Sequence, residues 1–587
     1  MRTQQVAVTL SAALLLGALP LIAAHGDEQM DTDMMMPTPA TSANPTTSHQ
    51  APPSYFSHIP YTGWMISHIA SMIVGWIFVL PAAIMLSVAQ SRYSLPTQLV
   101  FHLINGLGVV SGFIYNHATP DLYAGNSHHP LGWIVSSFTV VWTLMSVVVA
   151  YGDFAKRRSN QRHVMTMQAM ARHDNMHAFV GDEQARWSGD SGQGTERNSA
   201  SLSLGSRQNS FDGIHQKPEV PPSPLGPDED DDDDSENRGF LGNSRVDRYL
   251  SSKIRKVSSR RIASVIRGMH LVLEKFLLLL GFTAILTGFV TYGGIFRNRE
   301  IFSGAAHFVK GGIFFWYGLL TLGRWMGAFA EFGWAWNIRP QHPLVARWKT
   351  RVPSAEFTES FVIWLYGASN VFLEHLNAWG QDWSAQDFEH VSITALFFGG
   401  GLLGMLLEST WIRNSSLASV EVQHDAALHH QIQDPEPGDN EAARWRKPPT
   451  YALSMNPMPA IVIMLLGTLM SSHKQPSMTS SMLHAQWGGL FLAFALARAV
   501  TYLTLYLRPP TSYYAARPPS ELVAAFCLTA GGLVFKLSAH DVVNSIEGSG
   551  VHATAVFTVC MGLTGIILSW EVVCLAIKGW AVKKERK

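Results

Sequence analysis

Charged residues are scarce in this chain, and cysteine is rarer still. Only 15% of its 587 residues are charged and 47% are apolar, a balance outside the usual range of soluble proteins. The formal net charge is zero, so nothing indicates a nucleic-acid partner. The three cysteines, Cys527, Cys560 and Cys574, all lie in late apolar segments. That placement supports neither a disulfide framework nor a thiolate zinc site, and it is typical of small apolar packing residues.

Long apolar runs take the place of the missing charge. A helix needs about 20 apolar residues to cross a bilayer, and we find eleven runs of roughly that kind. They lie near 64–88, 97–116, 130–151, 266–291, 305–327, 357–379, 390–412, 456–473, 484–506, 520–539 and 552–577. We therefore predict an all-α, polytopic membrane bundle of about eleven transmembrane helices. Four helices form a first domain, and seven form a C-terminal domain at 297–577.

The N-terminus has the composition of a secretory signal. Residues 1–24 contain one basic residue, an apolar run, and small residues at Ala23 and Ala24, which favours a signal peptide. A signal anchor is the alternative, because the apolar run is only moderately short. Residues 25–60 are rich in Met, Asp, Thr, Ser and Pro. They have too little apolar content to fold, so a disordered lumenal segment is predicted.

Basic residues set the predicted orientation. They gather in alternate loops, which by the positive-inside rule face the cytosol. These residues are Arg92, Lys156, Arg157, Arg158, Lys253, Arg255, Lys256, Arg260, Arg261, Arg339, Arg347, Lys349, Arg351, Arg444, Arg446, Lys447, Arg508 and Arg517. The tail 578–587 is basic as well. We expect the N-terminus to be lumenal or extracellular and the tail cytosolic, in a membrane of the secretory system such as the plasma membrane or the vacuole.

Two polar segments interrupt the apolar runs. The stretch 152–262 is rich in Ser, Gln, Gly and Pro and carries an acidic run at 228–234. Such a segment cannot bury enough apolar surface to offset chain entropy, so we predict a disordered, acidic cytosolic loop. A second polar loop, 414–450, is also expected on the cytosolic side.

Histidines open the first four apolar runs, on alternating faces of the membrane. On the predicted topology, His68 and the pair His128-His129 lie near outer helix ends, whereas His102 and His270 lie near inner ends. Histidine is costly to bury in lipid unless it has a partner, and a haem iron provides one. Two histidines at equal depth on antiparallel helices can hold a haem between them. Interfacial histidines that only form hydrogen bonds are the alternative.

The residues around these histidines resemble the cytochrome b561 family, a ferric-reductase-like transmembrane domain. Each of the four helices contributes a matching stretch. The stretches are His68-Ile-Ala-Ser-Met72 through Trp76 and Pro81 to Arg92-Tyr93, His102 with Asn105 and Gly112, His128-x-x-Leu131-Gly132, and His270 followed by Leu280-Gly281 and Thr287-Gly288. The resemblance implies a b561-like domain at 61–151 and 263–296 that holds two haems b and moves electrons across a membrane, often to reduce ferric iron.

The same resemblance implies how the ligands pair. His68 pairs with His128, rather than with His129, on the outer side. The inner pair is His102 with His270. Glu274 stands where that family usually has glycine, and it could crowd the inner haem.

By analogy with that family, the electron donor is a small cytosolic reductant, plausibly ascorbate, that approaches near Arg92, Lys156 and Arg267. The order of parts along the whole chain also resembles the fungal Ytp-type integral membrane proteins. That likeness covers nearly all of the sequence, and it implies no mechanism.

Seven histidines of the C-terminal domain are predicted at outer helix ends. Three of them adjoin a carboxylate in the sequence, and imidazole with carboxylate suits zinc, iron or copper. The seven are His307, His375, His390, His473, His484, His540 and His552. We therefore expect a lumenal metal ion or a further haem there. The alternative is that these histidines only cap helix ends at the interface.

Charged residues also lie in or beside the apolar runs of this domain. In lipid such ions need partners or an aqueous path, so a transport pathway and structural ion pairs both stay open. These residues are Lys310, Arg324, Glu331, Glu408, Arg498, Lys536 and Glu571.

The leading hypothesis is a di-haem electron carrier that takes electrons from the cytosol and delivers them outward to a metal ion, as a transmembrane metal reductase would. One alternative is a metal or small-solute transporter with a vestigial haem domain. Another is a structural or regulatory membrane protein whose acidic loop recruits partners.

Overall fold

The computed structural model describes residues 54–184, 260–298, 300–375, 385–433, 447–473 and 475–586. All regular structure in these ranges is helical. The predicted signal peptide, nearly all of the predicted lumenal segment and the acidic run lie outside these ranges. The chain divides into two compact units. One unit comprises Thr139–Lys275, and the other comprises Met1–Phe138 with Phe276–Lys587.

The helices follow the predicted apolar runs. In chain order they are α2 (Thr62–Met72), the π-helical η1 (Ile73–Val79), α3 (Leu80–Val88), α4 (Ser94–Ala118), α5 (His128–Gln184), α7 (Arg260–Gly293), α8 (Glu300–Met326), α9 (Ala355–His375), α10 (Ala385–Glu408), α11 (Thr410–Gln433), α13 (Met458–Ser472), α14 (Met478–Leu507), α15 (Ser520–Leu537), α16 (His540–Gly548) and α17 (Ala553–Glu585). Each of the eleven predicted runs falls on one of these helices or on the continuous α2–η1–α3 segment.

Eight helical spans within the described residues are long and apolar enough to cross a membrane. The all-α membrane fold is therefore confirmed, and the count of eleven spanning helices stays a prediction. Helix α13 falls short because it has 15 residues. Helices α8 and α9 carry charged side chains that lower their apolar content.

The surface of α4 shows why these helices suit lipid rather than water. Its exposed face is apolar, with Leu103 75% and Phe113 65% exposed. Its buried face carries polar or small residues, including Gln98, Asn105 and Ser111. This is the reverse of a helix on a water-soluble protein. A bilayer around the exposed face accounts for the arrangement, because hydrocarbon solvates apolar side chains and leaves polar ones to the bundle interior.

The first span changes its winding after His68. Helix α2 passes into the π-helical segment η1 and then into α3, which begins at Leu80. Pro81 accounts for the change, because a proline has no N–H to donate to the carbonyl four residues earlier. Segments of this kind are frequent at functional sites. Here the wide turn carries Trp76, whose indole N–H donates to Asn105 Oδ1 on α4 at 2.9 Å.

The C-terminal domain packs its helices closely through glycine. A Cβ on Gly532 of α15 would lie 2.6 Å from the carbonyl oxygen of Gly311 on α8, and a Cβ on Gly311 would lie equally close to the carbonyl of Gly532. Small residues that let backbones approach are the usual means of helix association in lipid. Phe491 and Phe494 of α14 are fully buried beside this contact, in the apolar core of the domain.

Residues 152–184 differ from the prediction. They continue α5 as a helix to Gln184, where the sequence led us to expect the start of a disordered loop. The reason is local, since residues 153–180 contain no proline or glycine and are rich in Ala, Met, Gln and Arg, which favour helix. Part of the second polar loop is helical as well, because α11 extends to Gln433.

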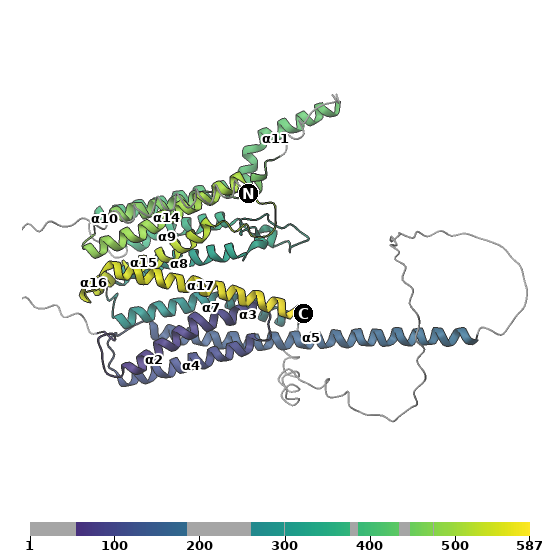
Figure 1. The fold of residues 1–587 in the computed structure, drawn as a ribbon, viewed down its shortest axis with the longest axis horizontal. Helices are drawn as coiled ribbons and strands as arrows, with labels where there is room; N and C mark the ends of the chain where they lie inside the picture. The colour runs from purple at the N-terminus through teal and green to yellow at the C-terminus, as the bar shows by residue number, and fades with distance from the viewer. Residues whose placement is uncertain are drawn as a thin grey trace, which may run out of the picture. The chain divides into compact units, whose positions relative to one another are not determined.

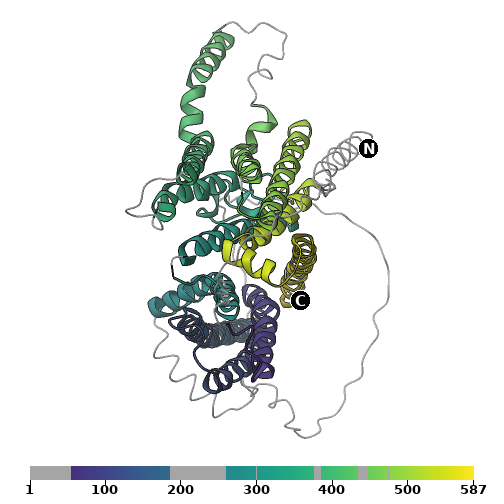
Figure 2. The ribbon, with the colours of Figure 1, turned by 90° about the vertical axis from the view of Figure 1, so that its left-hand side faces the viewer.

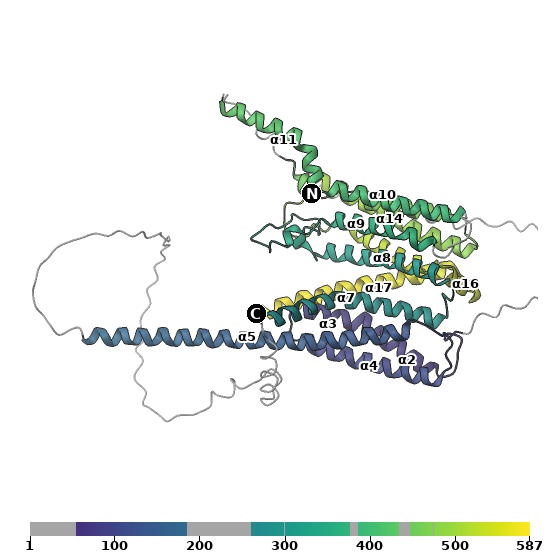
Figure 3. The ribbon, with the colours of Figure 1, turned by 180° about the vertical axis from the view of Figure 1, so that it is seen from behind.

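The two ends of the larger unit are distinct. Helix α16 lies at the end of the bundle where α2 begins, and the C-terminal end of α17 lies at the opposite end (Figure 1). Figure 3 shows the same arrangement from behind. Figure 2 turns the bundle by 90°, so that most of its helices are seen close to end-on. On the predicted orientation, α16 faces the lumen and the basic tail faces the cytosol.

Candidate functional site

The structure brings His68 and His128 together. His68 lies on α2 and His128 is the first residue of α5. Their ring centres are 6.1 Å apart and the ring planes are inclined by 78°. A metal that binds two opposite imidazoles with bonds of about 2 Å holds their ring centres about 6 Å apart. The pair therefore has the separation that bis-histidine ligation requires.

Each ring is oriented by a hydrogen bond at Nδ1. His68 Nδ1 lies 2.8 Å from the carbonyl oxygen of Gly108, so it must donate. His128 Nδ1 lies 3.2 Å from Thr287 Oγ1, whose own hydroxyl donates to the carbonyl of Ala284. Thr287 therefore accepts from His128. Both rings then carry their proton on Nδ1, which leaves Nε2 as the metal-binding nitrogen, the usual second-shell arrangement of ligand histidines.

Glycine lies against each of the two rings. A Cβ on Gly112 would come within 2.7 Å of His68 Nδ1, and a Cβ on Gly288 within 3.0 Å of the His128 ring. Both glycines sit where any side chain would displace an imidazole. Together with the Nδ1 contacts, these glycines fix two neighbouring imidazoles, each with Nε2 left for a metal. Haem b fits this donor set.

His129 does not share these features. Its side chain is exposed, and its backbone N–H donates to Asn126 Oδ1 at 3.2 Å. Among the described residues it is His128 that contacts His68. The choice of His128 over His129 remains a prediction until it is measured.

His102 and His270 fall in different compact units. His102 is half-buried on α4, with its ring centre 5.3 Å from that of Phe101. His270 is 7% exposed, and its Nε2 lies 2.8 Å from Ser146 Oγ. Ser146 donates its own hydrogen to the carbonyl of Trp142, so it accepts from His270. Glu274 Oε2 lies 3.7 Å from His270 Nδ1. Both ring nitrogens thus face polar atoms, and ligation through Nε2 would require the contact with Ser146 to break.

The histidines predicted in the C-terminal domain do not form one cluster among the side chains that the structure describes. His473 Nδ1 pairs with Glu389 Oε2 at 2.6 Å. His484 is buried and bonds the carbonyl of Ser480 within its own helix, and His307 bonds Ser303 in the same way. Each of these contacts engages the Nδ1 atom of its imidazole.

The other histidines of that set vary in their surroundings. His552 is exposed just before α17. The side chain of His375 lies outside the described residues. His390 is half-buried on α10.

His540 has two carboxylates within reach. Its Nδ1 lies 4.0 Å from Glu300 Oε2 and 3.8 Å from Asp541 Oδ1, and one ligand atom from each of the three residues lies within 4.8 Å of the others. Two atoms bound to one zinc ion at about 2.0–2.2 Å each are at most about 4.4 Å apart. The trio therefore needs little movement to hold a cation. The sequence pointed to His540, and Glu300 was missed because it lies far away in the chain.

Loop contacts connect this trio with the histidine pair. Asp541 Oδ2 accepts from the backbone N–H of Phe296 at 2.8 Å. The hydroxyl of Tyr123 in turn donates to the carbonyls of Ile295 and Phe296 at 2.8 and 2.9 Å. Tyr123 lies in the short loop that leads to His128. Burial raises its pKa, so the hydroxyl stays protonated and able to donate at neutral pH.

A buried ion network joins α8, α9, α14 and α15. Arg324 donates to Glu359 Oε1 at 2.6 Å and to Glu356 Oε1 at 3.1 Å. Arg498 donates to Glu359 Oε2 at 3.3 Å and its Nε lies 2.8 Å from Glu521 Oε1. Glu359 thus bridges two arginines. All five side chains are at least nine-tenths buried, and their formal charges leave one negative charge in excess.

The sequence singled out both arginines of this network and none of its glutamates. Glu356 and Glu359 are three positions apart in the sequence, which places them on one helix face. This spacing is the signal in the sequence that could have identified them. Because Arg324 and Arg498 both pair with glutamates, the structure favours structural ion pairs over isolated charges.

Comparisons with known proteins place the chain in a family. The profile described as "Protein YTP1-like, C-terminal" matches residues 280–579, and a domain of unknown function matches residues 49–152. An uncharacterized membrane protein of Schizosaccharomyces pombe is 32% identical over 538 residues, which cover 90% of this chain and 96% of that protein.

Two proteins of Saccharomyces cerevisiae are also similar. An uncharacterized membrane protein is 34% identical over 315 residues, which cover 52% of this chain and 47% of that protein. Protein YTP1 is 21% identical over 351 residues, which cover 60% of this chain and 61% of that protein. No solved structure matches. The match to more than half of the chain, together with the S. pombe relative, shows that this membrane protein belongs to the YTP1-like family.

Proposed function

We propose that this chain is a transmembrane electron carrier that holds haem b between His68 and His128. The observation that carries the proposal is the pair itself, with ring centres 6.1 Å apart and each Nδ1 bonded to the protein. Histidines that only form hydrogen bonds at the membrane interface would need neither a ring-centre separation that matches metal ligation nor a glycine against each ring. The b561-like resemblance of the surrounding residues supports the same assignment.

The residues of the site have distinct roles. His68 and His128 would hold the haem iron, and Gly112 and Gly288 give their rings room. The carbonyl of Gly108 and the hydroxyl of Thr287 hold the ring protons on Nδ1. Haem b, when bound, accepts and releases one electron at a time.

The carrier would pass electrons from the cytosol to the lumenal or extracellular side. The donor we propose is a small one-electron reductant, such as ascorbate. The acceptor is a metal ion at Glu300, His540 and Asp541, where ferric iron would gain one electron and leave as ferrous iron. This trio suits the role because Phe296 and Tyr123 link it to the loop before His128.

A second haem between His102 and His270 remains part of the proposal. The contact of His270 with Ser146 makes it the weaker of the two sites. If haem occupies both sites, His102→Ala should remove half of the bound haem. If haem occupies only the outer site, His102→Ala should remove none.

The deciding experiment uses the full chain purified in detergent from cells supplied with haem. A reduced-minus-oxidised spectrum with a bis-histidine b-type alpha band is expected. His68→Ala and His128→Ala should each abolish the outer haem, and His129→Ala is the matched control that should retain it. A known b-type cytochrome made in the same cells serves as the control for haem supply. If it contains haem and the purified wild-type protein does not, the proposal is ruled out.

Transport of a metal ion or small solute is the second candidate, and the buried network around Arg324 and Arg498 favours it. Charged groups in a membrane bundle commonly mark an ion or solute path. Uptake into protein-containing vesicles that needs no reductant would support transport. Uptake that depends on a reductant and on His68 would support the carrier instead.

A further inference from the structure

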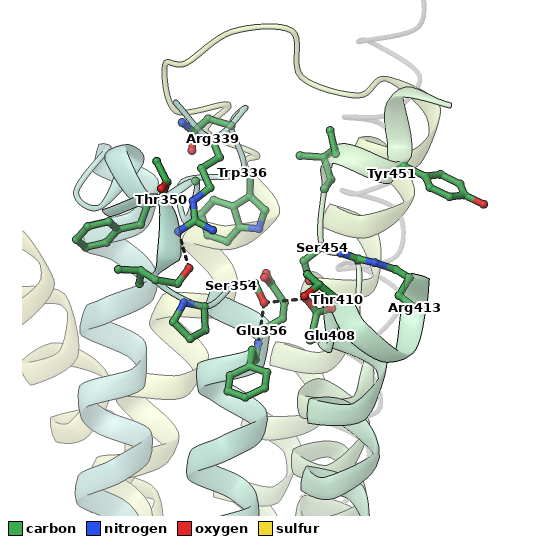
Figure 4. A pocket seen from close by; sticks show the side chains of 18 of the residues that line it. Trp336, Arg339, Thr350, Ser354, Glu356, Glu408, Thr410, Arg413, Tyr451 and Ser454 are labelled. Atoms are coloured by element: carbon green, nitrogen blue, oxygen red, sulfur yellow. Dashed lines mark hydrogen bonds between the residues drawn. The ribbon is translucent and has the colours of Figure 1, made fainter. Parts of the chain in front are cut away.

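A cavity of about 600 Å³ opens at the end of the C-terminal domain where α8 ends and α9 begins (Figure 4). The loop between these helices, the end of α10, the start of α11 and the segment before α13 form its walls. Four arginines and two glutamates are the charged residues that line it, which leaves two positive charges in excess. They are Arg324, Arg339, Arg351, Arg413, Glu356 and Glu408.

Both carboxylates on the cavity wall already have partners. Glu356 accepts from Arg324 at 3.1 Å. Glu408 accepts from the hydroxyl of Ser354 at 2.7 Å through one oxygen and from that of Ser454 at 2.8 Å through the other. The two contacts of Glu408 join the residue before α9, the end of α10 and the segment before α13. Figure 4 shows Ser354, Glu408 and Ser454 side by side. Neither carboxylate pairs with Arg339, Arg351 or Arg413 in the described contacts.

Arg339 is held in place without a counter-ion among the described residues. Its Nη2 donates to the carbonyls of Lys349 and Val352, and its Nε is buried with no hydrogen-bond partner among the described residues. Burial lowers the pKa of this guanidinium, since no described carboxylate offsets its desolvation. In Figure 4 its head group points down into the cavity, and that of Arg413 enters from the other side.

Trp336 offers a second donor. Its side chain is 4% exposed, and its indole Nε1 has no hydrogen-bond partner among the described residues. The ring lies under the Arg324 guanidinium, 4.3 Å from ring centre to Cζ, and its nitrogen is on the cavity side in Figure 4. A buried donor without an acceptor costs about 1–3 kcal/mol, which an oxygen of a bound ligand would offset.

We propose that this cavity binds a phosphate group. Guanidinium groups recognise phosphate through paired, charge-assisted hydrogen bonds, and three of them surround this space without a carboxylate partner. The indole N–H of Trp336 supplies a further donor. A phosphate monoester carries up to two negative charges, which would balance the excess on the lining.

The phosphate could belong to a lipid headgroup or to a soluble molecule. Both sources present the same phosphate oxygens to the arginines. The cavity lies at the helix ends predicted to face the cytosol, where lipid headgroups and soluble phosphates are both accessible. Arg339 and Arg351 had been assigned to the positive-inside pattern by sequence. The cavity gives the same charges a ligand-binding role that a topological signal does not require.

Thermal unfolding of the purified full chain in one detergent tests the proposal. The probes are inorganic phosphate and short-chain phosphatidic acid, each against sodium chloride at equal ionic strength. Stabilisation by phosphate indicates a soluble source, and stabilisation by phosphatidic acid alone indicates a lipid headgroup. A melting temperature that neither probe raises above the chloride control would overturn the proposal.

A pair of matched variants localises the effect. Arg351→Gln with Arg413→Gln removes two exposed cavity arginines, and Arg347→Gln with Arg508→Gln removes two exposed arginines that do not line the cavity. The first pair should raise the apparent Kd at least about tenfold, with the ligand-free melting temperature unchanged, and the second should not alter it. Equal loss of binding in both double variants would mean nonspecific charge attraction and would also reject the site.

Discussion

A Cβ atom on Gly112 would lie 2.7 Å from Nδ1 of His68, so these two residues fit together only because Gly112 has no side chain. The added methyl of Gly112→Ala would clash with His68 Nδ1. This is the atom that donates to the carbonyl oxygen of Gly108, 2.8 Å away. The ring would have to rotate, which would change its present arrangement against the ring of His128. We expect Gly112→Ala to lose most of the outer haem, as measured by the ratio of the haem band to protein absorbance.

Gly106 provides the matched control on the same helix. A Cβ at Gly106 would meet nothing within 4 Å, so Gly106→Ala should retain haem. Equal haem content in the two variants would show that the His68 ring does not need its present position.

The hydroxyl of Thr287 should tune the outer haem rather than hold it. Thr287→Val keeps the shape of the side chain and removes the acceptor that faces His128 Nδ1 at 3.2 Å. Loss of such a second-shell partner typically weakens metal binding about 10–100-fold. We expect a lower haem occupancy and a shifted midpoint potential, measured by spectroelectrochemical titration.

Thr283→Val serves as the control for that change. Thr283 bonds its own helix at the Leu279 carbonyl and is exposed, so its replacement should leave the midpoint potential where it is. A shift of equal size in both variants would argue against a specific contact with His128.

The sequence was sufficient for the all-helical membrane fold. The structure brings the rings of His68 and His128 into contact, and their role as a ligand pair stays a prediction. Apolar runs identify membrane helices because lipid requires them to be apolar over their length, and His68 and His128 occupy equivalent ends of two such runs. Partners on distant segments could not be derived in this way. Glu300 meets His540 only through the packing of α8 against α16, and spacing along the chain does not report that contact.

The sequence also did not predict how far the helices extend into the polar segments. Residues 152–184 have the low apolar content of a disordered loop, but many of them have high helix propensity. The structure continues α5 through them. The cavity around Arg339 was missed for another reason. Its arginines are scattered over two loops and a helix, and their basic character had a sufficient explanation in membrane topology.

Arg498 should be essential for the stability of the C-terminal domain. It is 1% exposed and pairs with Glu359 and Glu521. Removing one partner of a buried ion pair costs about 3–5 kcal/mol, because the other charge stays buried without compensation. Arg498→Met should therefore lower the melting temperature in detergent strongly, as followed by intrinsic tryptophan fluorescence.

Two further variants show whether the cost comes from charge. Arg498→Met with Glu521→Gln should recover part of the loss, since Glu359 keeps its bond with Arg324. Lys349→Met breaks a more exposed pair with Glu331 and should cost about 0–1 kcal/mol. A double variant as unstable as Arg498→Met alone would instead assign the loss to packing.

His540 should control metal binding at the end of the bundle that is predicted to face the lumen. Zinc is a redox-inert probe of the trio formed by Glu300, His540 and Asp541, and titration of the purified chain should show a site that His540→Ala weakens at least about tenfold, since it removes the nitrogen ligand. His552 was predicted from sequence as an equivalent ligand, yet the trio is formed without it. His552→Ala should therefore bind zinc as the wild type does. If both variants bind equally well, the metal lies elsewhere, and the acceptor site must be sought among His473, Glu389 and their neighbours.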